Sequence, residues 1–400
     1  MVYIIKKDGT KEEFDANKIK RAVNKSAGRV MYRFTDDEIN FICKYATDRA
    51  EAMSRERKGG KIMIQDMHNI VEGALEQVNP AVAKSYRDYR NYKVDFIHMM
   101  DEVYTKSQSI RYIGDKSNAN TDSALVATKR SLIFNELNKE LYRKFFMNRN
   151  ELQACKDGYI YIHDQSARLD TMNCCLFDVG SVLRGGFEMG NVWYNEPKTL
   201  DTAFDVMGDI ILSTAAQQYG GFTVPEVDKI LSPYAQKSYN KYYEEFLKYS
   251  DPSWEGREEK GRVYAWEKVC RDCDQGWQGI EYKLNTVGSS RGDYPFVTVT
   301  LGLGTGRFEK MISKSLLKVH MGGQGKAGHK KPVLFPKIVF LYDEEIHGDG
   351  KECEDVFEAG VACSAKTMYP DWLSMSGQGY ISSMYKKYKK VSARWGVVPS

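Results

Sequence analysis

The first candidate for chemistry is Cys363, which lies in the run Ala-Cys-Ser-Ala-Lys-Thr-Met-Tyr-Pro-Asp at residues 362–371. Pro370 cannot continue a helix and pushes Tyr369 toward extended geometry, so we expect a long helix to end here with the thiol in its last turns. A lone buried cysteine is most often a small core residue. A thiol held just before a forced helix break can also reach into a cavity, and the residues alone leave both interpretations open.

A second thiol candidate comes from the adjacent pair Cys174 and Cys175, in the run Met-Asn-Cys-Cys-Leu-Phe-Asp. Neighbouring side chains of a strand point to opposite faces, so only one of these thiols can face a given cavity. Cys270 and Cys273 have a spacing that occurs in metal and redox sites. A structural zinc site needs four ligands and no second pair follows, so we predict that this pair is incidental and that there is no metal site.

Two further motifs admit both a functional and a structural interpretation. His163 and Asp164 follow an expected strand at 158–163 and could form an acid/base or metal pair, but a hydrogen-bonded histidine at a strand end is the more common case. The glycine-rich turn at 302–306 follows an expected strand at 295–301 and opens a helix, so its amides could cradle a phosphate. Its glycine spacing fits neither a dinucleotide-binding fold nor a P-loop, so this signal is weak.

Basic residues gather near the N-terminus. A β-hairpin is expected over residues 2–14 around the turn Asp-Gly, and a helix capped by Asp15 should follow it. The basic residues of this stretch that could meet an anion are Lys6, Lys7, Lys18 and Arg21. Without further information, lysines at a strand end are solvated charges.

The elements that would position these residues form two groups. After the hairpin, helix signals follow at 35–55, at 64–78 and from Pro80 onward. From 158 to 371, helices alternate with β-branched strands, which is typical of α/β architecture. We therefore predict a β-hairpin with a helical bundle, followed by an α/β domain.

Composition excludes several classes of protein. Among 400 residues, 42% are hydrophobic, 28% are charged and the net charge is +4, which is too small over this length to argue for direct nucleic-acid binding. No apolar run approaches the roughly 18–20 residues of a membrane helix, and no export signal opens the chain. The eight cysteines should therefore be reduced thiols, and we expect a cytoplasmic protein.

Taken together, the motifs resemble those of the anaerobic, glycyl-radical ribonucleotide reductases. Asn-Cys-Cys, Tyr-Gly-Gly, Phe-Pro-Lys and Met-Tyr-Pro-Asp occur in the order that this family has them. The N-terminal stretch resembles the ATP-cone regulatory domain of the same family. The resemblance implies an ATP-cone over residues 1–95 and an incomplete ten-stranded α/β barrel over residues 96–400, truncated at its C-terminal side.

The resemblance also implies roles for single residues. Cys363 would carry the thiyl radical that abstracts the ribose 3′ hydrogen, and Cys174 would take part in reducing the 2′ carbon while Cys175 packs. In the cone, Lys6, Lys7 and Lys18 would hold the phosphates of ATP or dATP, with Arg21 less certain. Lys7 stands where the family commonly has arginine, which keeps the charge but loses the bidentate fork.

Partners and cofactors follow from the same resemblance. The substrates would be ribonucleoside triphosphates, ATP and dATP would be allosteric effectors, and formate would be the reductant. A radical S-adenosylmethionine activase would generate the glycyl radical, and the protein would be a homodimer. Family members place the radical glycine and a four-cysteine zinc site beyond the last motif seen here.

The last residues, Arg-Trp-Gly-Val-Val-Pro-Ser, stand where family members have Met-Gly-Cys-Arg. Codons for these residues can be chosen so that a one-base shift encodes Met-Gly-Cys-Arg-Ala-Phe. From this we expect a frameshift or sequencing error that truncates a longer reading frame and leaves the 400-residue chain alone without reductase activity.

Two rival hypotheses remain at this point. A glycyl-radical lyase would share the barrel, but an ATP-cone argues against it because a lyase has no need of adenine-nucleotide control. A truncated nucleotide-binding remnant or decoy subunit would have the cone without the chemistry.

Overall fold

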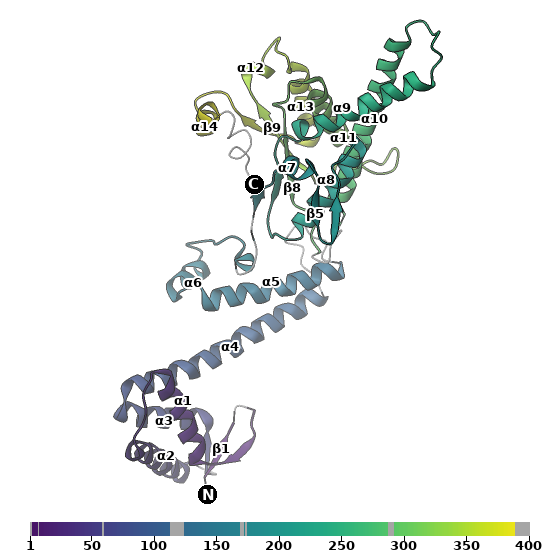
Figure 1. Cartoon of the computed structure of the whole chain (residues 1–400). Helices are drawn as coiled ribbons and strands as arrows, with labels where there is room; N and C mark the ends of the chain where they lie inside the picture. Colours follow the sequence, from purple (N-terminus) through teal and green to yellow (C-terminus); the bar gives the residue numbers. More distant parts are fainter. Residues whose placement is uncertain are drawn as a thin grey trace. The chain divides into compact units, whose positions relative to one another are not determined.

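The computed structural model describes residues 2–6, 8–57, 60–112, 124–168, 172, 174–286 and 292–388. The chain divides into two compact units, Met1–Thr105 and Lys106–Ser400, with the boundary inside helix α4 (Figure 1). Each unit has its own hydrophobic core, so each is described by itself.

The first unit contains a small three-stranded sheet in the order β2-β1-β3. Strands β1 (Tyr3–Ile5) and β2 (Lys11–Glu13) form the expected antiparallel hairpin. Strand β3 (Lys61–Met63) pairs in parallel with β1 and was not predicted, because three residues between two helices give too short a pattern to recognise.

Four helices complete this unit, and the local caps that the sequence indicates are present. They are α1 (Ala16–Arg29), α2 (Asp36–Glu56), α3 (Ile64–Val78) and the first part of α4 (Pro80–Tyr112). Asp15 accepts a hydrogen bond from the Asn17 amide at 2.8 Å. Thr35 and Glu38 form a reciprocal capping box, which fixes the start of α2.

The second unit begins with helices rather than with the strand predicted at 158–163. Helices α5 (Val126–Phe145) and α6 (Arg149–Lys156) precede a short 3₁₀ turn, η1 (Gln165–Ala167). Residues 158–163 have no strand structure, and Tyr159 and Tyr161 are exposed, so the strand prediction is wrong here. Alternation of aromatic and β-branched residues produces a strand only where a partner strand is available.

A five-stranded parallel sheet forms the centre of the second unit. Its order is β10-β9-β8-β7-β4. The strands are β4 (Cys175–Leu176), β7 (Phe222–Val224), β8 (Val297–Leu301), β9 (Lys337–Tyr342) and β10 (Asp371–Ser374). Strands β8 and β9 were predictable because each has five or six residues rich in β-branched and apolar side chains, whereas the three-residue β7 is too short for a recognisable pattern.

Helices connect these strands, as parallel pairing requires. They are α7 (Val179–Leu183), α8 (Leu200–Ala215), α9 (Val227–Tyr249), α10 (Arg257–Leu284), α11 (Arg307–Gly322), α12 (Glu344–His347) and α13 (Glu354–Thr367). A further helix, α14 (Tyr380–Tyr388), follows the strand β10. A hairpin of β5 (Phe187–Met189) and β6 (Val192–Tyr194) lies between α7 and α8.

The two faces of the sheet carry different side chains. One face packs into the same apolar core as α8, α9, α10, α11 and α13, and we call it the helix face; its residues include Phe222, Val224, Val297, Val299, Ile338 and Phe340. Strand alternation places the residues between them on the other face, which we call the second face. Its residues include Thr223, Thr298, Thr300, Val339 and Leu341.

The α/β prediction is therefore confirmed, and the strands of the described sheet all pair in parallel. The described sheet has five strands, so the ten-stranded barrel stays a prediction from the resemblance. No helix within the described ranges is long and apolar enough to span a membrane.

Candidate functional site

Cys174 lies on the second face of the central sheet. It directly precedes β4, and the next residue, Cys175, packs against the helix-face core together with Phe177. Because successive side chains of a strand point to opposite faces, Cys174 and Leu176 lie on the second face. Leu176 is in register with Thr223 there. The Cys174 side chain is exposed, so its thiol is available to a ligand on this face.

Cys175 is held on the opposite side of the strand. Its thiol lies 3.1 Å from Oε1 of Gln218, and burial raises its pKa. A neutral thiol donating to an amide oxygen is a packing arrangement, not that of an activated nucleophile.

Cys363 lies on α13 with its side chain in the helix-face core. Its side chain is fully buried in the helix-face core, its sulfur lies 3.6 Å from the Thr367 hydroxyl, and burial raises its pKa. On the same helix, Gly360 approaches the sheet so closely that an added Cβ would meet the Trp372 ring at 2.9 Å. The thiol therefore faces the layer between α13 and the sheet.

The structure does not bring the two predicted catalytic thiols together. Strand β4 forms one edge of the sheet and β10, which follows α13, forms the other. Four strand spacings of about 4.8 Å separate these edges by roughly 19 Å. Cys174 and Cys363 also belong to opposite faces, so the radical role of Cys363 stays a prediction from the resemblance.

Hydroxyl groups accompany Cys174 on the second face. Thr223 and Thr298 are in register across β7 and β8, and both are buried. The Thr300 hydroxyl accepts a hydrogen bond from the Glu226 amide at 2.7 Å. The Thr223 hydroxyl has no hydrogen-bond partner among the described residues, although a buried hydroxyl usually has one.

In the first unit, two of the predicted phosphate-binding lysines converge on one carboxylate. The Lys6 ammonium lies 2.8 Å from Glu12, and Lys18 pairs with the other oxygen of the same carboxylate. Arg21 is exposed and has no ion pair in the described part of the chain. Lys7 lies outside the described residues. The structure thus places Lys6 and Lys18 next to each other, as a shared phosphate site would require.

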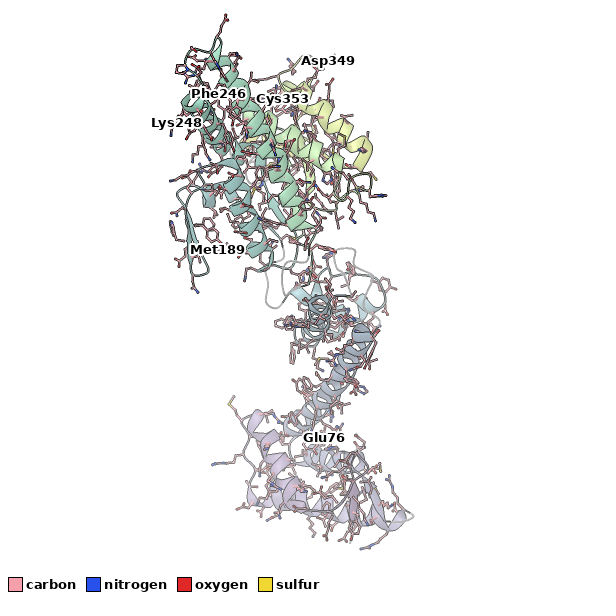
Figure 2. The ribbon with its side chains drawn as sticks, turned by 90° about the vertical axis from the view of Figure 1, so that its right-hand side faces the viewer. Glu76, Met189, Phe246, Lys248, Asp349 and Cys353 are labelled. Carbon is pink, nitrogen blue, oxygen red and sulfur yellow. The ribbon has the colours of Figure 1, made fainter. Side chains whose placement is uncertain are left out.

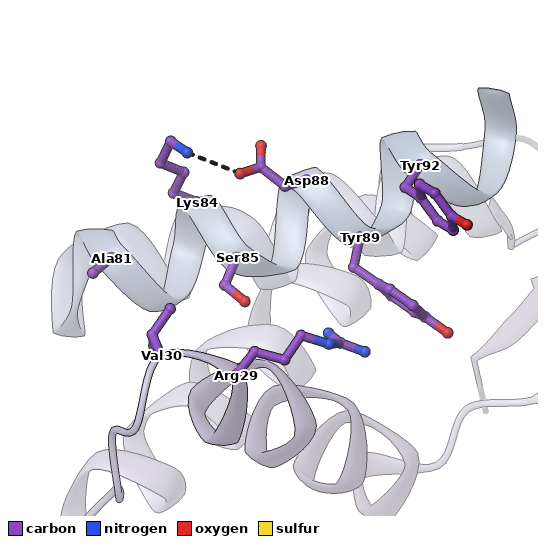
Figure 3. Close-up of a pocket in the computed structure, with 8 residues that line it drawn as sticks. All are labelled: Arg29, Val30, Ala81, Lys84, Ser85, Asp88, Tyr89 and Tyr92. Carbon is purple, nitrogen blue, oxygen red and sulfur yellow. Dashed lines mark hydrogen bonds and ion pairs between the residues drawn. The ribbon is translucent and has the colours of Figure 1, made fainter. Parts of the chain in front are cut away.

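A groove of about 470 Å³ lies at the other end of α1, between α1 and α4 (Figure 3). The Arg29 guanidinium stacks on the Tyr89 ring at 3.8 Å, and Lys84 pairs with Asp88 at 2.9 Å. None of Lys6, Lys18 and Arg21 lines this groove. Along α1, Lys18 and Arg29 are separated by roughly 16 Å, so the groove is distinct from the predicted phosphate site.

The remaining motifs have local explanations. His163 pairs with the neighbouring Asp164 at 2.6 Å in an exposed position. Cys270 and Cys273 lie about one turn apart on α10, as expected, and Cys273 is fully buried. The described residues contain no group of three or more metal-ligating side chains.

Three contacts with charged or ionisable side chains were not predicted. Glu12 was overlooked because a glutamate on a hairpin strand is unremarkable until its neighbours are known. Asp228 and His347, which bind the glycine turn after β8, come from sequence positions far from that turn. In the sequence, the glycine-rich turn was the only feature that pointed to these contacts.

Sequence comparison identifies the family. A model of the family described as anaerobic ribonucleoside-triphosphate reductase matches residues 117–395, and a model of the ATP cone domain matches residues 2–94. Because the first match covers more than half of the chain, the chain belongs to the anaerobic ribonucleoside-triphosphate reductase family.

Two curated relatives agree with this assignment. The anaerobic ribonucleoside-triphosphate reductase of Haemophilus influenzae is 31% identical over 96% of this chain and 53% of that protein. The Escherichia coli enzyme of the same name is 29% identical over the same shares. A crystal structure of the anaerobic ribonucleotide reductase from Thermotoga maritima, with glycerol in its active site, aligns with 75% of this chain and 52% of that chain at 15% identity, with a TM-score of 0.48. The chain spans about half the length of the curated relatives it matches.

Proposed function

We propose that the whole protein reduces ribonucleoside triphosphates to deoxyribonucleoside triphosphates under anaerobic conditions, and that its N-terminal unit regulates this reaction by binding ATP or dATP. The observation that carries the proposal is the family match over residues 117–395 together with the cone match over residues 2–94. A glycyl-radical lyase and an inactive remnant have no comparable support.

The regulatory part rests on the pair of lysines in the cone. Lys6 and Lys18 share the Glu12 carboxylate, so two ammonium groups lie around one anion. A nucleotide phosphate carries more negative charge than this carboxylate and would compete with it for both lysines. Arg21 is exposed on the same helix as Lys18, and Lys7 and Arg21 would add charge to the site.

The catalytic part rests on Cys174. Its exposed thiol lies on the second face of the sheet, so a nucleoside bound on this face would meet the Cys174 sulfur. A glycyl radical formed by a radical S-adenosylmethionine activase would supply the radical, and formate the reducing equivalents. No described residues form a zinc site, so zinc remains an implication of the family.

The assignment of Cys363 as the radical-carrying thiol is kept as a separate proposal. The resemblance supports it, whereas its burial in the helix-face core argues for packing. Cys363→Ala in the whole protein distinguishes the two. Loss of turnover with an unchanged melting temperature indicates the radical role, and retained turnover with lower stability indicates a core thiol.

Calorimetric titration of the 400-residue chain with ATP tests the regulatory proposal. Lys18→Ala should weaken binding about tenfold or more, because a charged hydrogen bond contributes about 1.5–3 kcal/mol. Lys25→Ala is the matched control, since Lys25 is an exposed lysine on the same helix and has no ion pair in the described ranges. Absence of binding at millimolar ATP, or equal effects of both substitutions, would remove this assignment.

A further inference from the structure

The glycine turn that leaves β8 has a backbone that only glycine fits at two points. Gly302 has a φ of +115°, and a Cβ at this position would lie 2.9 Å from the Leu341 carbonyl oxygen. A Cβ on Gly304 would lie 2.6 Å from Cβ of Glu309 and 2.9 Å from Oδ2 of Asp228. The turn is therefore closely packed on both sides and leads directly into α11.

Asp228 binds the amide side of this turn. Its Oδ2 accepts hydrogen bonds from the amides of Gly302 at 3.1 Å and Gly304 at 3.2 Å, and from the Ser313 hydroxyl at 3.2 Å. Its Oδ1 accepts from the amide of Lys229 at 3.0 Å. Four donors from α9, the turn and α11 thus converge on one fully buried carboxylate.

His347 binds the carbonyl side of the same turn. Its Nε2 lies 2.8 Å from the Gly302 carbonyl oxygen and donates to it, while its Nδ1 accepts from the Asp343 amide at 3.0 Å. The same Nδ1 lies 3.0 Å from the Asp343 carbonyl oxygen, so Nε2 is the donor to Gly302 whether the imidazole is neutral or protonated. The Cys353 thiol, whose residue is labelled in Figure 2, lies 3.7 Å from the Gly304 carbonyl oxygen.

Burying an ionisable side chain costs free energy that an apolar side chain in the same place would not cost, and both Asp228 and His347 are buried. Burial raises the pKa of Asp228 to about 6 despite its four donors, and burial lowers the pKa of His347. The charged and titratable groups around Asp228 are Glu226 and Lys229 from its own segment, Glu309 from α11, and Cys353 at the start of α13. Asp343 is the acidic group beside His347.

We propose that Asp228 and His347 are a pair of positioning residues that fix the Gly302–Gly306 turn from its two sides, and that acidification loosens the amide side of the turn, which Asp228 holds. An ionised Asp228 is the acceptor for both glycine amides, and His347 is the donor to the glycine carbonyl. Protonation of Asp228 weakens the amide side of the turn, whereas a protonated His347 keeps its Nε2 proton and still donates to the Gly302 carbonyl. The turn lies at the carboxyl end of β8, the edge at which open parallel sheets bind ligands.

The release is local and does not require unfolding. The pKa of Asp228 is higher in the folded chain than its ordinary value, so the folded chain takes up this proton more readily than the unfolded chain does. Acidification therefore protonates Asp228 inside the fold. The consequence is a loosened turn within an intact unit.

Amide hydrogen exchange of Gly302 and Gly304 in the full chain tests the proposal. After correction for intrinsic exchange rates, protection of both amides should fall about tenfold between roughly pH 7 and pH 5, the loss expected for one hydrogen bond to a charged group. Asp228→Asn should show the low protection at both pH values. Glu281→Gln is the control, because Glu281 is an equally buried carboxylate that bonds His320 and Gln324 and should leave the pH step at the turn unchanged.

The wild-type measurement alone can overturn the proposal, whatever the stability of the variants. Equal protection at both pH values would show that the turn does not respond to these groups. A pH step that persists in Asp228→Asn would assign it to another residue. Calorimetry with ATP reports on the cone alone, so failure of the regulatory proposal would leave this result unaffected.

Discussion

Exposure distinguishes one accessible thiol of the second unit from three buried ones. Cys174 is exposed, whereas Cys273, Cys353 and Cys363 are fully buried with raised pKa values. We expect iodoacetamide to label Cys174 in the native chain and the three buried thiols only in urea, because the thiolate is the reactive form. Mass spectrometry of tryptic peptides measures this. Labelling of Cys363 as fast as that of Cys174 would contradict the burial described here.

Asp228 should also give the folded chain a characteristic pH dependence. Its pKa is about 6 in the fold against an ordinary value of 3.8, so the folded state binds the proton at a higher pH than the unfolded state does. Its contribution to the free energy of unfolding is then greatest below about pH 4 and declines as the pH rises to about 6. The difference in stability between wild type and Asp228→Asn, from urea unfolding at several pH values, should follow this decline. A flat difference would mean that the carboxyl titrates normally.

At the level of single residues, the sequence predicted local partners better than distant ones. Asp15 and the pair Thr35–Glu38 act within one turn of their own helices, and the starts of both helices were correctly predicted. Glu12, which joins Lys6 to Lys18, was not, because that contact depends on how the hairpin meets α1. For Cys174, strand alternation allowed either thiol of the pair to face a cavity, and the resemblance alone selected the first.

Helix α10 offers a direct test of how closely the elements pack. An added Cβ on Gly276 would meet the Phe204 ring of α8 at 2.0 Å, whereas one on Gly279 would meet nothing within 4 Å. Gly276→Ala should destabilise the second unit by about 1–3 kcal/mol or more through overpacking. Gly279→Ala should stabilise it by up to about 1 kcal/mol through helix propensity. Thermal unfolding of both variants measures this, and similar effects of the two substitutions would refute the close contact of α8 and α10.

At the level of elements, length decided what could be predicted. Long helices such as α10 and the apolar strand β8 have patterns that extend over several turns or pleats. The three-residue strands β3 and β7 are too short for a periodic pattern, and they form because a neighbouring strand is in place. The wrong strand at 158–163 is the converse case, a strand-like pattern without a partner.

At the level of the whole molecule, the α/β architecture and the family were predictable because several motifs occur in one order along the chain. The placement of Cys363 was not, because a cysteine near a helix end has the same sequence pattern whether it faces a cavity or a core. Its position on the helix face depends on the packing of α13 against β9 and β10. Site geometry therefore required the structure even where the family did not.

The most direct test of the proposed reductase is deoxynucleotide formation by the whole protein under strict anaerobiosis, with an activase, S-adenosylmethionine, formate, ATP and a ribonucleoside triphosphate. Cys174 lies on the second face and Cys175 on the helix face, so the two substitutions Cys174→Ala and Cys175→Ala form a matched pair one residue apart. Wild type and Cys175→Ala should form product, and Cys174→Ala should lose at least about a hundredfold in rate, the usual scale for removing a reacting group. Full activity of Cys174→Ala, with Cys175→Ala inactive, would contradict the account.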